Sequence, residues 1–152
     1  CLLITFCCLL LQENVHTLRL KRETPDRAAK TCILELNLEA ERVMKINGLK
    51  YTPEEDKDYA TYTDCYWRRM GYIHDNGDFE INNIKKMIVQ SIKSDVNTKK
   101  SMHKIADLIL EQCRFVSGST IGVKAIRMEN CIMKYYNIFI NKYSESGTNN
   151  FN

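Results

Sequence analysis

The spacing of the cysteines is the feature that most limits what this chain can fold into. Of seven cysteines in 152 residues, three lie among the first eight positions, and the other four are Cys32, Cys65, Cys113 and Cys131. An even number in a small secreted chain predicts two disulfides, although four cysteines allow three pairings. None of the four forms a Cys-x-x-Cys pair, which argues against a zinc knuckle or a redox motif.

The first seventeen residues are expected to be a secretory signal peptide. Residues 1–11 form an uncharged run that is too short to span a bilayer as a helix. The run fits the hydrophobic centre of a signal without its start methionine, and a buried N-terminal helix is the alternative. We therefore divide the chain into a signal at 1–17, a helical domain at 18–143 and a flexible polar tail at 144–152. We expect a secreted, extracellular protein that does not insert into membranes.

The charge of the chain is mild. The formal net charge of +3 becomes +4 once the signal leaves, because residues 1–17 carry one acid, Glu13, and no basic residue. A small domain with this charge stays soluble, and nothing in the value calls for a nucleic-acid partner.

Apolar residues recur every three or four positions in six segments, which predicts an all-α fold of six short helices. Thr24 and Pro25 open the first helix, which has Cys32 on its buried stripe. A second helix near 38–47 is expected to end in a left-handed cap at Gly48. Residues 52–55, Thr-Pro-Glu-Glu, are typical of a capping box that opens the third helix.

The third helix is expected to end at Gly71, before a turn whose tightest element is Asn76-Gly77. Three further helices follow, in the ranges 81–92, 102–113 and 121–139. Residues 117–120 separate the last two and supply caps for the sixth helix.

The cysteine pattern resembles that of insect odorant-binding proteins. That family places six cysteines along six helices and pairs first with third, second with fifth and fourth with sixth. Here Cys32, Cys65, Cys113 and Cys131 resemble the first, third, fourth and sixth. The stretch 65–73 and the acidic glycine turn 75–78 are also similar to the family's segment after the third cysteine. The resemblance implies the disulfides Cys32–Cys65 and Cys113–Cys131.

The two missing cysteines belong to one bridge of the family. Thr61 stands where the second cysteine would be and Gly122 where the fifth would be, so their joint absence resembles the family's four-cysteine branch. We expect the junction of the third and sixth helices to be looser without this bridge and to widen ligand access.

The resemblance implies a compact bundle around an internal apolar cavity that carries a small apolar ligand, such as an odorant or pheromone. Nine apolar positions are expected to face inward and contact the ligand: Met70, Ile84, Ile88, Met102, Ile105, Ile109, Phe115, Ile126 and Met133. Four tyrosines could offer a hydroxyl to a ligand oxygen: Tyr62, Tyr66, Tyr135 and Tyr136. Trp67 is expected either at the cavity edge or stacked on the surface. No catalytic residue, metal site or cofactor is expected.

Other functions remain open at this stage. His74-Asp75 resembles the pair of secreted phospholipases, but it lies in a turn and lacks their flanking cysteines and calcium loop. A secreted protein of the same fold could instead act in venom, saliva or reproductive fluid by scavenging a ligand or by surface contact. An olfactory receptor or a second copy of the chain are further candidate partners. His103, next to Met102, is a candidate pH sensor.

Overall fold

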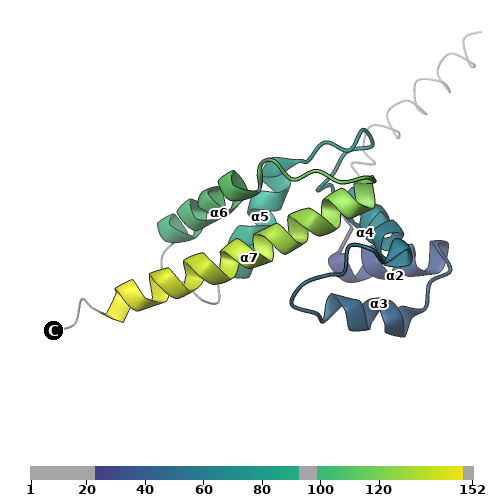
Figure 1. Cartoon of the computed structure of the whole chain (residues 1–152), viewed down its shortest axis with the longest axis horizontal. Helices are drawn as coiled ribbons and strands as arrows, with labels where there is room; N and C mark the ends of the chain where they lie inside the picture. The colour runs from purple at the N-terminus through teal and green to yellow at the C-terminus, as the bar shows by residue number, and fades with distance from the viewer. Residues whose placement is uncertain (1–22, 93–98, 149–152) are drawn as a thin grey trace, which may run out of the picture.

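A computed structural model describes residues 23–92 and 99–148, and these form six helices (Figure 1). They are α2 (Pro25–Glu35), α3 (Ala40–Asn47), α4 (Lys57–Arg69), α5 (Ile81–Ile92), α6 (Lys99–Cys113) and α7 (Ile121–Thr148). The described residues contain no strand, so the all-α prediction of six helices is confirmed. The expected signal peptide lies outside the described residues, as do positions 149–152 of the expected tail.

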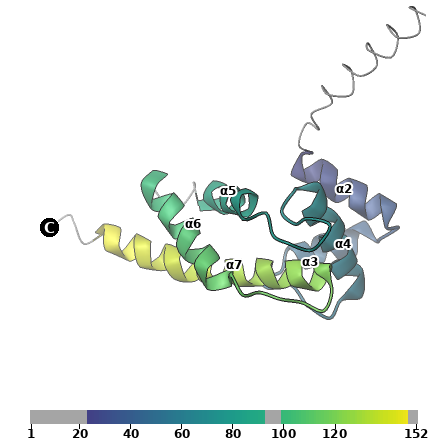
Figure 2. The ribbon, with the colours of Figure 1, turned by 90° about the horizontal axis from the view of Figure 1, so that it is seen from above.

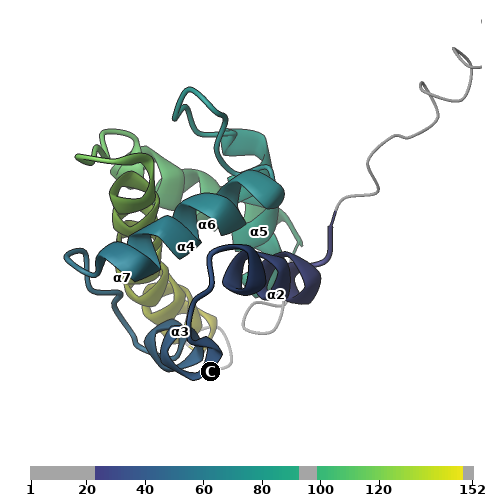
Figure 3. The same cartoon turned by 90° about the vertical axis from the view of Figure 1, so that its right-hand side faces the viewer.

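The long helix α7 is the element along which the others are arranged. It has 28 residues; α5 and α6 lie beside one stretch of it, and α2, α3 and α4 gather around its beginning (Figures 1 and 2). Figure 3 shows α4 crossing α7, with α2 next to α4. Because α7 continues to Thr148, residues 144–148 are helical rather than part of a flexible tail.

The buried side chains form two clusters. The larger one joins α5, α6 and α7 to the end of α4, with Ile84, Ile105 and Ile109 fully buried. The smaller one joins α2, α3 and α4 to the beginning of α7, around Val43 and Tyr62. The amphipathic helices thus bury their apolar stripes against one another in two places, instead of around one central space.

The two disulfides are those that the family resemblance implied. Cys32–Cys65 ties α2 to α4 across a Cα–Cα distance of 5.9 Å. Cys113–Cys131 ties the end of α6 to α7 across 5.8 Å. In the chain-entropy model, closing loops of these lengths stabilises the fold by roughly 3–4 kcal/mol each.

The helix ends agree only partly with the sequence pattern. Pro25 begins α2 as predicted, and α4 ends at Arg69, two residues before the expected Gly71, whose φ is 66°. The left-handed cap at Gly48 is wrong, because its φ is −79° and the chain continues in a right-handed turn. The capping box at 52–55 is also wrong. Helix α4 begins later, where the Asp56 carboxylate accepts a hydrogen bond from the Tyr59 N–H at 3.0 Å.

Helices α4 and α7 touch at Gly122. A Cβ atom at this position would lie 2.0 Å from the carbonyl oxygen of Ala60, so only glycine allows the two backbones to approach this closely. The family's absent bridge would join positions 61 and 122, and a cysteine at 122 would force the helices apart. The contact is tight at this point, and the looser junction expected from the missing bridge stays a prediction.

We predict that Gly122→Ala destabilises the protein by about 1–3 kcal/mol, because the added methyl group must push α4 and α7 apart. Chemical denaturation measures the change. Gly48→Ala is the matched control, since Gly48 has a right-handed backbone and its Cβ would meet nothing closer than 3.5 Å. The control is expected to be neutral or slightly stabilising. Equal effects of the two substitutions would contradict the close contact.

Candidate functional site

A cavity of about 660 Å³ lies between α2, α4, α5, α7 and the segment that follows α3. It opens to the surface, because Met44, Leu49 and Met133 at its edge are between 41% and 61% exposed. Its deeper lining includes Tyr62 and Ile88, which are almost fully buried. The cavity is thus open on one side instead of enclosed in the centre of the bundle.

The apolar wall of the cavity comes from three helices. Ala29 projects from α2, Met87 and Ile88 from α5, and Ile132 from α7. Together with the methionines at the mouth, these side chains offer an adaptable surface, because the unbranched thioether of methionine takes many shapes.

Another part of the lining is polar. Three tyrosines on one face of α4, Tyr59, Tyr62 and Tyr66, line the cavity together with Glu129 of α7. Their rings form a row, with centroids 5.5 Å apart from Tyr59 to Tyr62 and 5.9 Å apart from Tyr62 to Tyr66. Burial raises the pKa of all three hydroxyls, for Tyr66 to about 12, so they stay protonated in neutral solution.

Glu129 is the one acidic side chain at the deep end. The indole N–H of Trp67 donates to its Oε1 at 2.5 Å, and Trp67 itself is 1% exposed. Removal from water raises the pKa of Glu129 from 4.5 to about 7, and the Trp67 hydrogen bond only partly offsets this. Glu129 as a residue is partly accessible and lines the cavity, while its carboxyl is largely removed from water.

Polar contacts hold the rim of the cavity in place. The side chain of Asn130 pairs with the backbone of Thr52 through two hydrogen bonds, of 2.8 and 2.9 Å, which pin the segment after α3 to α7. The hydroxyl of Tyr59 donates to Asn47 at the end of α3. Arg42 of α3 pairs with Asp56 at the start of α4, at 2.7 Å. These contacts together hold α3, the start of α4 and the segment between them in place.

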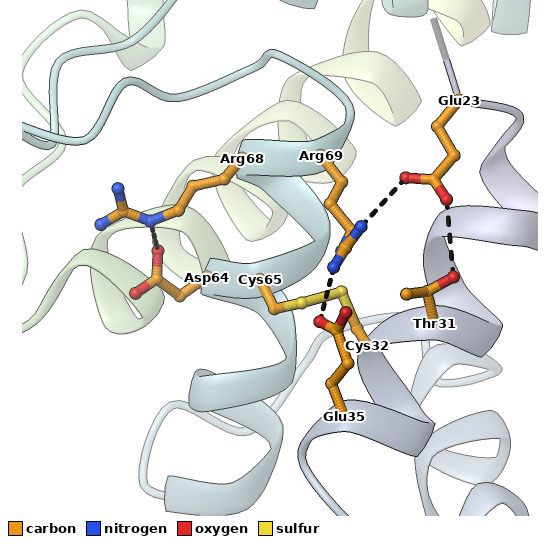
Figure 4. The surroundings of a disulfide bond; sticks show 8 residues. All are labelled: Glu23, Thr31, Cys32, Glu35, Asp64, Cys65, Arg68 and Arg69. Carbon is orange, nitrogen blue, oxygen red and sulfur yellow. Dashed lines mark hydrogen bonds and ion pairs between the residues drawn. A yellow bond between two sulfur atoms is a disulfide. The ribbon is translucent and has the colours of Figure 1, made fainter.

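The α2 wall is held by the first disulfide and a neighbouring ion-pair group (Figure 4). The guanidinium of Arg69 on α4 reaches Glu23 at 3.3 Å and Glu35 at 2.5 Å, on either side of the Cys32–Cys65 bridge. A covalent bond and the Arg69–Glu35 ion pair connect α2 to α4, and the Arg69–Glu23 pair holds the residue that precedes α2, so this wall of the cavity is fixed relative to α4.

The structure brings only part of the predicted ligand-contacting set to this cavity. Ile88 and Met133 line it. Five others lie in the larger core cluster, away from the cavity lining: Met70, Ile84, Met102, Ile105 and Ile109. Ile126 is fully buried in the smaller cluster. The helices pack these side chains against one another in the two core clusters.

The inward position expected for Phe115 is wrong. Its side chain is 81% exposed, because α6 has already ended at Cys113 and the chain turns outward. The guanidinium of Arg114 lies 4.4 Å from the centre of its ring, a cation–π contact at the surface.

Of the four tyrosines that were expected to offer a hydroxyl, Tyr62, Tyr66 and Tyr136 line the cavity. Tyr135 stacks on Phe139 in the larger cluster instead. Trp67 is 1% exposed in the larger core cluster and outside the cavity lining, so neither expected position, the cavity edge or the surface, is the one observed; it reaches the cavity only through its hydrogen bond to Glu129. The sequence reasoning missed Glu129 and Tyr59. The sequence did contain an indication for Glu129, because it lies one helical turn after Ala125, beside the inward stripe of α7.

Neither histidine of the described residues takes part in the site. His74 faces Glu80 at 3.6 Å, and its neighbour Asp75 pairs with Arg68, so these two side chains have separate partners. His103 is exposed on α6. Among the described residues no three His, Cys, Asp or Glu side chains are grouped as metal ligands would be. In the same part of the chain, no helix has the length and apolar character needed to cross a membrane.

The chain matches a family model described as the PBP/GOBP family, the odorant- and pheromone-binding proteins of insects, over residues 16–135. The matched region includes α2 to α6 and the first half of α7, and so every element that lines the cavity. A search of curated proteins found no match, and neither did a search of solved structures.

The raised pKa of Glu129 predicts how stability depends on pH. A carboxyl that is harder to ionise when folded stabilises the protein at low pH, and this contribution is lost as the pH rises from 4.5 to about 7. Glu129→Gln keeps an acceptor for Trp67 but does not titrate. We therefore expect the unfolding free energy of the wild type to fall by about 2–3 kcal/mol relative to the variant between pH 5 and pH 8. Chemical denaturation at both pH values measures this, and a constant difference would contradict the burial of Glu129.

Proposed function

The chain belongs to the PBP/GOBP family, and from this premise we propose that it is an extracellular carrier that binds a small hydrophobic molecule, such as an odorant or pheromone, in the cavity beside α7. The observation that carries the proposal is the cavity itself. Its volume of about 660 Å³ falls in the range of roughly 300–1,000 Å³ that is usual for small-molecule sites.

The energetics agree with a carrier that binds and releases its ligand. A guest that buries about 300 Å² of apolar surface gains roughly 7 kcal/mol before entropy losses, which is consistent with micromolar binding. The disulfide between α2 and α4 and the ion pairs of Arg69 hold one wall in place, so little ordering of the protein is needed on binding.

The mouth supports exchange with the surrounding solution. Met44 is 61% exposed and Leu49 is 50% exposed, and both lie at the mouth, where a ligand would enter. A flexible, apolar rim lowers the barrier to entry and suits guests of different shape. The tight α4–α7 contact at Gly122 lies elsewhere, so we assign ligand access to this mouth and not to the junction left by the missing bridge.

We include the four-cysteine type in the proposal. Every cysteine of the described residues is used in the two disulfides, and glycine takes the position of one missing cysteine. The backbone contact that Gly122 permits joins the same two helices that the lost bridge would join. In this proposal, close backbone packing holds α4 against α7, where a disulfide would join them in the six-cysteine pattern.

We predict that Ala29→Phe lowers the affinity for an uncharged apolar fluorescent probe by at least about tenfold, because the ring occupies the space where the guest would bury its surface. Probe titration measures the affinity, and circular dichroism checks the fold. Phe115→Ala is the control, because its side chain is 81% exposed and outside the cavity lining, and it is expected to bind like the wild type.

If the folded wild type takes up no probe, the carrier function is wrong and a surface-acting secreted protein becomes the better reading. If Phe115→Ala weakens binding as much as Ala29→Phe, the ligand binds at another place.

A further inference from the structure

At the deep end of the cavity, several hydrogen-bond acceptors are grouped with the Glu129 carboxyl. Glu129 and the three tyrosines of α4 line the same wall. The charge of Glu129 contributes to the raised pKa of each tyrosine hydroxyl, so all three lie within its electrostatic reach. This grouping comes from two helices, α4 and α7, that cross in direct contact.

The hydrogen-bond inventory of this group leaves acceptors in excess. A carboxylate has about four acceptor positions, and the Trp67 N–H occupies one position on Oε1. The hydroxyl hydrogen of Tyr59 is already donated to Asn47, so its oxygen can serve a guest only as an acceptor. A guest that fits here brings hydrogen-bond donors.

The charges that line the cavity favour a cation. Apart from Glu129, the described lining contains two charged side chains, Asp26 on α2 and Lys50 after α3. Lys50 lies at the rim, where it is exposed and its Nζ is 5.7 Å from the ring of Tyr51. With Glu129 ionised, the lining carries a net charge of −1, and its one positive group lies at the mouth and not at the deep end.

We propose that the guest carries a basic amine, whose ammonium group donates to the Glu129 carboxylate and the neighbouring tyrosine hydroxyls while its apolar body lies against Met87, Ile88 and Ile132. An ammonium has several donors and no acceptor, and it supplies the positive charge that a partly buried carboxylate lacks. The proposal rests on the proposed carrier function and names the chemical class of the ligand for the same cavity.

Binding of such a guest depends on pH in a defined direction. In the empty protein, burial holds the pKa of Glu129 at about 7, so below this pH the carboxyl is mostly protonated and attracts a cation poorly. The titratable groups that face it are the α4 tyrosines, which stay protonated at neutral pH, and Asp26 and Lys50 farther out. Affinity for an amine therefore rises between pH 5 and pH 8, and affinity for an uncharged guest stays constant.

The test compares three guests with the same phenyl-ethyl body: phenethylamine, phenethyl alcohol and ethylbenzene. Each displaces an uncharged apolar fluorescent probe from the oxidised full chain at pH 8. We expect the amine to bind at least about tenfold more tightly than the alcohol, which matches the usual strength of a charge-assisted hydrogen bond. In the wild type, the amine should lose at least about tenfold in affinity between pH 8 and pH 5.

Glu129→Gln separates the charge from the shape of the site. The variant keeps the side-chain size and the Trp67 acceptor. We expect the ratio of the amine affinity to the ethylbenzene affinity to fall by at least about tenfold and to lose its pH dependence, while circular dichroism checks the fold. Glu55→Gln, an exposed acid outside the cavity lining, is the matched control for net charge and should behave like the wild type.

Each outcome has one meaning. If ethylbenzene and the probe bind but the amine has no advantage over the alcohol, or if Glu129→Gln keeps that advantage, the amine proposal is overturned and the carrier function stands. If none of the guests displaces the probe from a folded protein, or the probe itself does not bind, the carrier function and the amine proposal both fail.

Discussion

The backbone contact between α4 and α7 at Gly122 is the constraint on which the rest of the structure depends. Because the glycine has no side chain, the carbonyl of Ala60 can lie against it, and the two helices approach closely at the start of α7. This approach sets the position of Glu129, two turns farther along α7, next to the tyrosines of α4. The two disulfides then fix α2 to α4 and α6 to α7, so these two further helices are placed relative to the pair.

The cavity follows from how the two core clusters divide the apolar side chains. The apolar side chains of α5, α6 and α7 pack in the larger cluster. Those of α2, α3 and α4 pack in the smaller cluster, together with the beginning of α7. Between them remains a space that is bordered by apolar side chains on one side and by tyrosines and a carboxyl on the other. A bundle with one filled centre would have left no such space. The division, more than the number of helices, therefore creates the candidate binding site, and the polar wall is the basis of the selectivity that we propose.

A partly buried carboxyl is an unusual choice for a cavity that receives hydrophobic guests. Its ionised form is destabilised by removal from water, and its single observed hydrogen bond, from Trp67, offsets this only in part. Such a group lowers the stability of the empty protein at neutral pH, and a guest with a complementary charge recovers that loss. In the proposed function, Glu129 couples stability to binding, and its hydrogen bond comes from Trp67, the only tryptophan of the chain.

The sequence by itself determined the six helices and, through the resemblance of its cysteine pattern, the two disulfides. Helical periodicity is a local property, and Cys32 and Cys113 lie fully buried on predicted stripes. It could not determine the binding set: Ile105 and Phe115 both looked inward, yet one lies in filled core and the other on the surface. Which apolar faces meet and where they leave a gap depends on helix crossings, and the decisive one at Gly122 is a contact between residues that are far apart in the chain. Only the tertiary structure brings Glu129 to the tyrosines of α4, because no local pattern records which helix lies opposite.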